Sequence, residues 1–143
     1  MKYLLLIGFT IFSLNITFCQ TAADARQRLE DEKREFFTRN IELTRSEAKA
    51  FWPVYDDYQN RKDKIVAEKR TLMRYYIQNG ENMKDQEITE TLNRYIALEQ
   101  QETELFITFN KKFREILPDE KVLRIYVAEV KFKDYLLKKL RTD

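Results

Sequence analysis

The chain has 143 residues and a formal net charge of +2, with 26 basic residues, 24 acidic residues, no histidine and one cysteine. This length suits one small domain, and the balanced charge gives no global attraction to nucleic acid. Without histidine, neither a catalytic triad nor a His-based metal site can form, so we expect a protein with no enzymatic activity, cofactor or metal.

The first nineteen residues have the pattern of an export signal. Lys2 supplies the positive end, and residues 3–18 are mainly apolar. Thr17 and Cys19 put small residues at positions −3 and −1 of a cleavage site after Cys19. We therefore expect a signal peptide over residues 1–19 that directs export, followed by a single helical domain over residues 20–143.

The alternative is a lipoprotein anchored through Cys19, but Phe18 is a poor residue before a lipidated cysteine. Cleavage after Cys19 removes Lys2 and the only cysteine, which leaves a net charge of 25 minus 24, or +1, and no disulfide. It also removes Gly8, so Gly80 is the only glycine of the mature chain. Because residues that break helices are this scarce, we expect long helices and few turns.

Two helices are predicted in the first half of the chain. Residues 22–40 form the first, anchored by Phe36 and Phe37, with a start that frays. The second begins at Thr44, where Glu47 completes a capping box, and runs to about residue 78. Its expected core face is Ala48, Phe51, Trp52, Tyr55, Tyr58, Val66, Met73, Tyr76 and Ile77.

Pro53 lies inside this second helix, where it removes one backbone hydrogen bond and should bend the helix. Residues 79–82 form the clearest turn, with Gly80 suited to a left-handed conformation. Asp85 is the expected cap of a third helix that ends near Leu117. Its expected core face is Ile88, Leu92, Tyr95, Leu98, Phe106, Phe109, Phe113 and Ile116.

The second and third helices should pair antiparallel about the turn, with facing residues whose numbers add up to about 162. This register places Tyr55 near Phe106. It also places Lys62 near Glu99 and Glu102, and we predict an ionic layer of these three residues that fixes the register. A metal site at the two glutamates is the alternative, but bundle sites of that kind pair Glu with His.

Pro118 suits the first position of a fourth helix that runs to about residue 140. Its end is basic, which we interpret as a solvated face; contact with a membrane surface is the alternative. The expected core stripe is Val122, Leu123, Tyr126, Val130, Leu137 and Leu140, widened by Ile125, Phe132, Tyr135 and Leu136. The basic residues are Lys131, Lys133, Lys138, Lys139 and Arg141.

Residues 43–47 and 117–121 look like two degenerate copies of one helix-start signal, beginning at Leu43 and Leu117, 74 positions apart. They resemble the paired LTxxQ motifs of the Spy/CpxP family of small helical periplasmic proteins. The block of Phe51, Trp52, Pro53, Val54 and Tyr55 is most similar to relatives labelled sensors of ECF-type sigma factors. The chain departs from the family pattern in having Glu47, Lys121 and Pro118 in place of Gln, Gln and Thr.

The resemblance implies a curved four-helix protomer that pairs antiparallel into an elongated, cradle-shaped homodimer. In chaperone members the concave surface holds unfolded polypeptides without ATP, and in regulatory members the protein reports envelope stress to a membrane-bound partner. The leading hypothesis is a chaperone of the envelope stress response. An adaptor that contacts an envelope signalling or anti-sigma partner in ECF sigma factor control is the second, and a purely structural dimer is the third.

The aromatic side chains of residues 51–58 are expected to be core rather than binding surface. Apolar residues off the predicted stripes and basic residues beside them are better candidates for contact with a client or partner. These candidates are Arg70, Arg74, Tyr75, Ile96, Ile107, Lys131 and Lys138.

Overall fold

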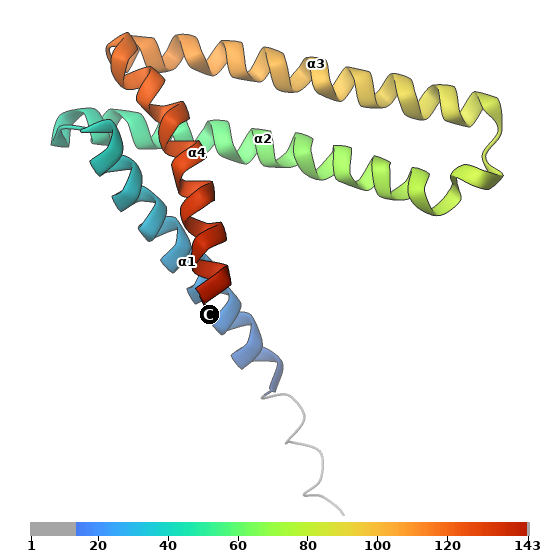
Figure 1. Ribbon diagram of the computed structural model, residues 1–143, viewed down its shortest axis with the longest axis horizontal. Helices are drawn as coiled ribbons and strands as arrows, with labels where there is room; N and C mark the ends of the chain where they lie inside the picture. The colour runs from blue at the N-terminus through green and yellow to red at the C-terminus, as the bar shows by residue number, and fades with distance from the viewer. Residues whose placement is uncertain (1–13, 143) are drawn as a thin grey trace, which may run out of the picture. The chain divides into compact units, whose positions relative to one another are not determined.

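A computed structural model describes the backbone of residues 14–142 and the side chains of residues 24–141. Within that range the chain forms four helices, a short 3₁₀ turn and no strand, which confirms the all-α prediction (Figure 1). The elements are α1 (Leu14–Ile41), α2 (Arg45–Asn79), η1 (Gly80–Asn82), α3 (Asp85–Ile116) and α4 (Asp119–Thr142). Most of the expected signal peptide, residues 1–13, lies outside the described residues, as do the side chains at its expected cleavage site.

The chain divides into two compact units. One spans residues 43–126 and contains α2, η1, α3 and the first turns of α4; the other contains α1 and α4 from Val127 onward. Among residues 14–142, none of the helices has the length and apolar character needed to cross a bilayer.

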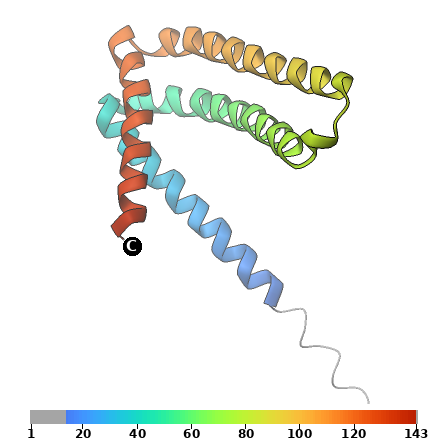
Figure 2. The same ribbon diagram turned by 45° about the vertical axis from the view of Figure 1, so that its right-hand side comes forward.

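In the first unit, α2 and α3 lie side by side as an antiparallel hairpin (Figures 1 and 2). The predicted capping box at the start of α2 is confirmed. The Glu47 amide donates to Thr44 Oγ1 at 3.3 Å, and the Thr44 amide donates to the Glu47 carboxylate at 2.7 Å. The helix continues through Pro53, and the bend there stays a prediction.

Two details of the turn differ from the prediction. Gly80 has a φ of −55° and a ψ of −35°, not a left-handed conformation, because the chain continues into η1. Lys84, not Asp85, is the cap of α3, and its amide donates to the Glu87 carboxylate at 2.9 Å. Among residues 14–142, the residue in a left-handed conformation is Glu42, with a φ of 59°, just after α1.

The register of the hairpin also differs from the prediction. The ring of Tyr55 lies 6.3 Å from that of Phe113, and Tyr58 lies 5.5 Å from Phe109, so facing numbers add up to 168 and 167 rather than 162. Phe106 instead lies 5.3 Å from Tyr126 of α4. The reason is the connection: η1 and the two residues after it delay the start of α3, which moves the facing residues further along α3.

The buried residues of the hairpin gather at the end away from the turn, which we call the base. There the rings of Phe51, Tyr55, Tyr58, Phe109 and Phe113 pack together, each 4% exposed or less. The first turns of α4 join the base through buried Val122 and Ile125. No side chain between residues 66 and 97 is buried. The hydrophobic core of this unit is therefore at the base.

In the second unit, Phe36 and Phe37 anchor α1 as predicted. Their rings lie 5.3 Å and 6.1 Å from that of Phe132 on α4. Glu32 of α1 accepts hydrogen bonds from the Tyr135 hydroxyl and, at 2.9 Å, from the Lys139 ammonium. These bonds hold the pKa of Glu32 below its usual value, with Tyr135 the largest cause.

The predicted core stripe of α4 is wrong for most of its members. Ile125, Ala128 and Phe132 are buried, whereas Leu123, Val130, Leu137 and Leu140 are exposed. The reason is that α4 has apolar side chains on two opposite sides, and periodicity does not distinguish the side that packs. Only Val122 of the six stripe residues is buried.

We expect Phe113→Ala to lower the free energy of unfolding by about 3–5 kcal/mol, because it removes a ring at the centre of the base. Ile107→Ala, at an exposed position on the same helix, should change it by less than about 0.5 kcal/mol. Urea unfolding followed by circular dichroism measures both. Equal losses would contradict the location of the core.

Candidate functional site

The half of the hairpin nearest the turn carries large apolar side chains that are open to solvent. We call this set the tip surface: Tyr75, Tyr76 and Ile77 of α2 with Leu92 and Ile96 of α3. Their exposed fractions run from 45% to 81%. These exposed apolar side chains mark the tip of the hairpin as a candidate interaction region. The consecutive residues Tyr75, Tyr76 and Ile77 project about 100° apart around α2, so the set surrounds the tip rather than forming one flat face.

Three of these residues, Tyr76, Ile77 and Leu92, were expected in the core. They are exposed because two helices share only one seam, and side chains beside the seam need a third element to cover them. At the base the first turns of α4 contribute, for example through Tyr126, whose hydroxyl donates to Asn110 at 2.8 Å. Near the turn, the 43–126 unit contains only α2, η1 and α3.

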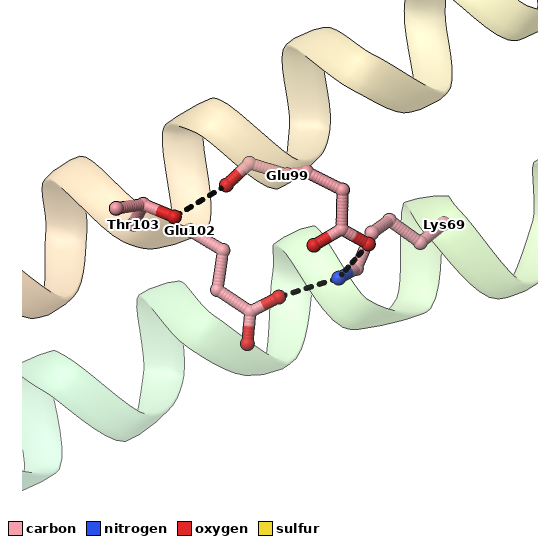
Figure 3. Close-up of polar contacts among 4 residues, drawn as sticks. All are labelled: Lys69, Glu99, Glu102 and Thr103. Atoms are coloured by element: carbon pink, nitrogen blue, oxygen red, sulfur yellow. Dashed lines mark hydrogen bonds and ion pairs between the residues drawn. The ribbon is translucent and has the colours of Figure 1, made fainter.

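An ionic layer lies between the base and the tip surface along the hairpin. Figure 3 shows Lys69 of α2 between Glu99 and Glu102 of α3. The Lys69 ammonium lies 2.8 Å from a Glu99 carboxylate oxygen and 2.5 Å from one of Glu102. The Lys69 side chain is only 16% exposed, and its hydrogen bonds to Glu102 and Glu99 raise its pKa. Hydrogen bonds from Lys69 and then Tyr95 lower the pKa of Glu99.

The two predicted glutamates are thus in the layer, but Lys69 rather than Lys62 is their partner. Lys62 instead lies 5.5 Å from the centroid of the Tyr58 ring. The two lysines are seven positions apart, about two helical turns, so they share one side of α2. In the observed register, Lys69, the lysine nearer the turn, faces the two glutamates. No cluster of three or more potential metal ligands is present among the described residues.

A second contact between the helices lies on the turn side of this layer. Arg94 of α3 donates through Nε to the Glu68 carboxylate of α2 at 2.9 Å. Both side chains are about half exposed, so the pair contributes little to stability. Together with Lys69, however, it sets which residues of α2 and α3 meet beneath the tip surface.

The two copies of the helix-start signal meet in the 43–126 unit. Lys121 Nζ lies 2.6 Å from the Glu47 carboxylate, and each side chain is about one fifth exposed. The same carboxylate oxygen accepts the Thr44 amide. These bonds lower the pKa of Glu47 to about 2, with Lys121 the largest cause. The pair therefore links the first turn of α2 to that of α4.

The Glu47–Lys121 pair was not predicted from the sequence, although a signal for it was present. The two residues occupy matching positions of the two copies and carry opposite charges. Of the other motif residues, Phe51 and Tyr55 are buried, and Trp52 stacks edge-on against Phe51 at 5.1 Å. Phe51, Tyr55 and Tyr58 are core, as expected, whereas Trp52 is half-buried.

The predicted contact residues divide between the two compact units. Arg70 and Arg74 are exposed one turn apart on α2, in the same half of the hairpin as Tyr75 and Ile96. Ile107 is exposed on α3, eleven residues beyond Ile96 and level with the base. The remaining two, Lys131 and Lys138, are exposed on α4 in the other unit.

No family model matches this sequence, and comparison with curated proteins and with solved structures gave no significant match.

We predict that the loss of folding stability at low pH depends on Glu47. The folded protein holds its pKa near 2, against an ordinary value of 4.5, so the ionised group stabilises the fold above about pH 5. That contribution is lost as the pH falls from 4.5 towards 2. Glu47→Gln should therefore lower Tm at neutral pH, and the difference from the wild type should vanish near pH 2.

Thermal unfolding across this pH range measures the effect. Glu115→Gln, at an exposed glutamate of α3, controls for the loss of one negative charge. A constant difference between Glu47→Gln and the wild type at every pH would contradict the role of the ion pair.

We expect Lys69→Met to lower Tm, because it leaves two carboxylates one turn apart with no cation between them. Adding Glu99→Gln and Glu102→Gln should recover much of the loss, because the uncompensated charges are gone. Lys62→Met, two turns away on the same side of α2, is the matched control and should have a smaller effect. A larger loss of Tm for Lys62→Met than for Lys69→Met would show that Lys62, as predicted from the sequence, is the partner of the two glutamates.

Proposed function

We propose that this protein is a non-enzymatic periplasmic protein of the Spy/CpxP type that binds unfolded or exposed polypeptides without ATP. The observation that carries the proposal is the tip surface, five large apolar side chains at 45% to 81% exposure. Arg70 and Arg74 lie beside it on α2. Unfolded chains offer complementary groups, namely apolar side chains and carboxylates.

The size of the tip surface implies weak and reversible binding. Burying one large aliphatic side chain completely contributes about 1.5–3 kcal/mol, and these five are already partly covered. Their burial gives a gross gain of roughly 4–8 kcal/mol before the entropic cost of association. A free energy of this size corresponds to dissociation constants from micromolar to millimolar as the tightest limit, and the entropic cost of association weakens the binding further. Such a client is released without an energy source.

The ionic layer and the base keep the tip surface available. Lys69 between Glu99 and Glu102 opposes sliding of α2 against α3, and sliding would change which apolar side chains the tip exposes. Arginine side chains beside the surface attract acidic segments over a longer distance and so raise the rate of encounter. The apolar side chains then retain the client.

The resemblance to the Spy/CpxP family adds support through the order of elements. The two copies of the helix-start signal open α2 and α4, and their Glu47 and Lys121 form an ion pair where the family has two glutamines. We propose that this pair replaces the glutamine amides in a structural role. The cradle-shaped homodimer of the family is part of this proposal.

A regulatory adaptor that contacts an envelope signalling or anti-sigma partner is the second candidate. It is favoured by the likeness of residues 51–55 to relatives labelled sensors of ECF-type sigma factors. The adaptor predicts one specific partner. The chaperone-type protein predicts protection of unrelated clients, so one assay separates the two.

The test is light scattering of several unrelated proteins as they unfold and aggregate, with the mature protein present in stoichiometric amounts. We expect slower aggregation of each client, and loss of most of this activity in the triple variant Tyr75→Gln, Ile77→Gln and Leu92→Gln. The matched control is Val127→Gln, Val130→Gln and Leu137→Gln, which removes three exposed apolar side chains of α4.

All six positions are exposed, so both triple variants should keep the fold, which circular dichroism checks. No protection of any client by the wild-type protein would overturn the chaperone-type function and favour the adaptor. Equal activity of the two triple variants would show that binding does not depend on the tip surface.

A further inference from the structure

The outer side of α4 is a second exposed apolar surface, separate from the tip surface. Val127, Val130 and Leu137 lie on one side of this helix at spacings of three and seven residues, and they are 49%, 63% and 47% exposed. The opposite side holds the buried residues of α4, including Phe132. We call the exposed side the outer face of α4.

Basic residues border this outer face. Between residues 127 and 142 the helix has five basic residues and two acidic ones. Lys131 and Lys138 lie along one flank by helical spacing, and Lys133 lies on the other. All three are exposed. Their long aliphatic stems can lie along apolar surface while the ammonium groups reach outward.

We propose that the outer face of α4 docks onto the surface of an anionic lipid bilayer, with the helix lying in the plane of the interface. An apolar stripe between flanks of lysine is the pattern of helices that bind in this way. Each lysine near an anionic leaflet contributes about 1 kcal/mol, and the apolar side chains enter the interface between them.

Charge decides between the possible occupants of this face. A second copy of α4 would bring lysine-rich flanks together, and like charges oppose that pairing. An anionic bilayer instead offers negative charge along the whole length of the helix. This argument is independent of the tip surface, so the proposal can succeed or fail whether or not that surface binds clients.

Asp134 limits the strength of the docking. It lies on the outer face between Val130 and Leu137, where a carboxylate opposes both apolar insertion and anionic headgroups. The proposal therefore predicts moderate binding by the wild-type protein and stronger binding when this one charge is removed. A nonspecific attraction of the basic segment predicts no dependence on the apolar residues.

The test is cosedimentation of the mature protein with vesicles of phosphatidylcholine and phosphatidylglycerol in a roughly two-to-one ratio, compared with phosphatidylcholine alone. We expect binding to the mixed vesicles at least about tenfold tighter than to the neutral ones. Val127→Gln, Val130→Gln and Leu137→Gln together should weaken it by about tenfold or more. Asp134→Asn should strengthen it several-fold.

The triple variant of the tip surface, Tyr75→Gln, Ile77→Gln and Leu92→Gln, is the matched control and should bind vesicles like the wild type. No binding of the wild type or Asp134→Asn to the mixed vesicles would overturn the proposal. So would unchanged binding by the α4 triple variant, which would show a purely electrostatic attraction. Circular dichroism confirms that each variant is folded before its binding is compared.

Discussion

The constraint on which the hairpin depends is that two helices share a single seam. At the base, the rings of α2 and α3 fill that seam and the first turns of α4 extend it, so the side chains become fully buried. Towards the turn the same unit has no third helix, and side chains beside the seam remain in water. The tip surface is a direct result of this geometry, because apolar residues continue along α2 and α3 beyond the point where α4 packs on them.

Ion pairs fix the positions of the helix segments that lie beyond the buried core. Lys69 bridges Glu99 and Glu102 where the buried rings end, and Glu47 joins Lys121 where α2 and α4 begin. Each has a partly buried side chain with more than one hydrogen-bond partner, which raises its contribution above that of an ordinary surface pair. Their main effect is to select one register, since any slip of α2 against α3 would separate Lys69 from its carboxylates.

Helix existence and type were predictable from the sequence, whereas the faces and the register were less so. The capping box at Thr44, the anchors Phe36 and Phe37 and the aromatic core around Phe51 carry strong local signals. The predicted register was wrong because the register depends on the length of the connection after Asn79. A shift of five or six residues was enough to put Lys69 in the place predicted for Lys62. The prediction of the buried face of α4 was wrong because apolar residues lie on both sides of that helix. Exposure of Ile77 and Leu92 depends on where a third helix is absent, which no local pattern encodes.

The most direct test is hydrogen exchange on the protein without residues 1–19, alone and with a partially unfolded polypeptide. Alone, amides of residues 51–65 and 98–113 should exchange far more slowly than those of residues 70–78 and 86–96, because only the former surround buried side chains. Addition of the polypeptide should slow exchange in residues 70–78 and 86–96 selectively. Uniform protection along both helices, or slowing confined to the base, would contradict the division into a packed base and an open binding tip.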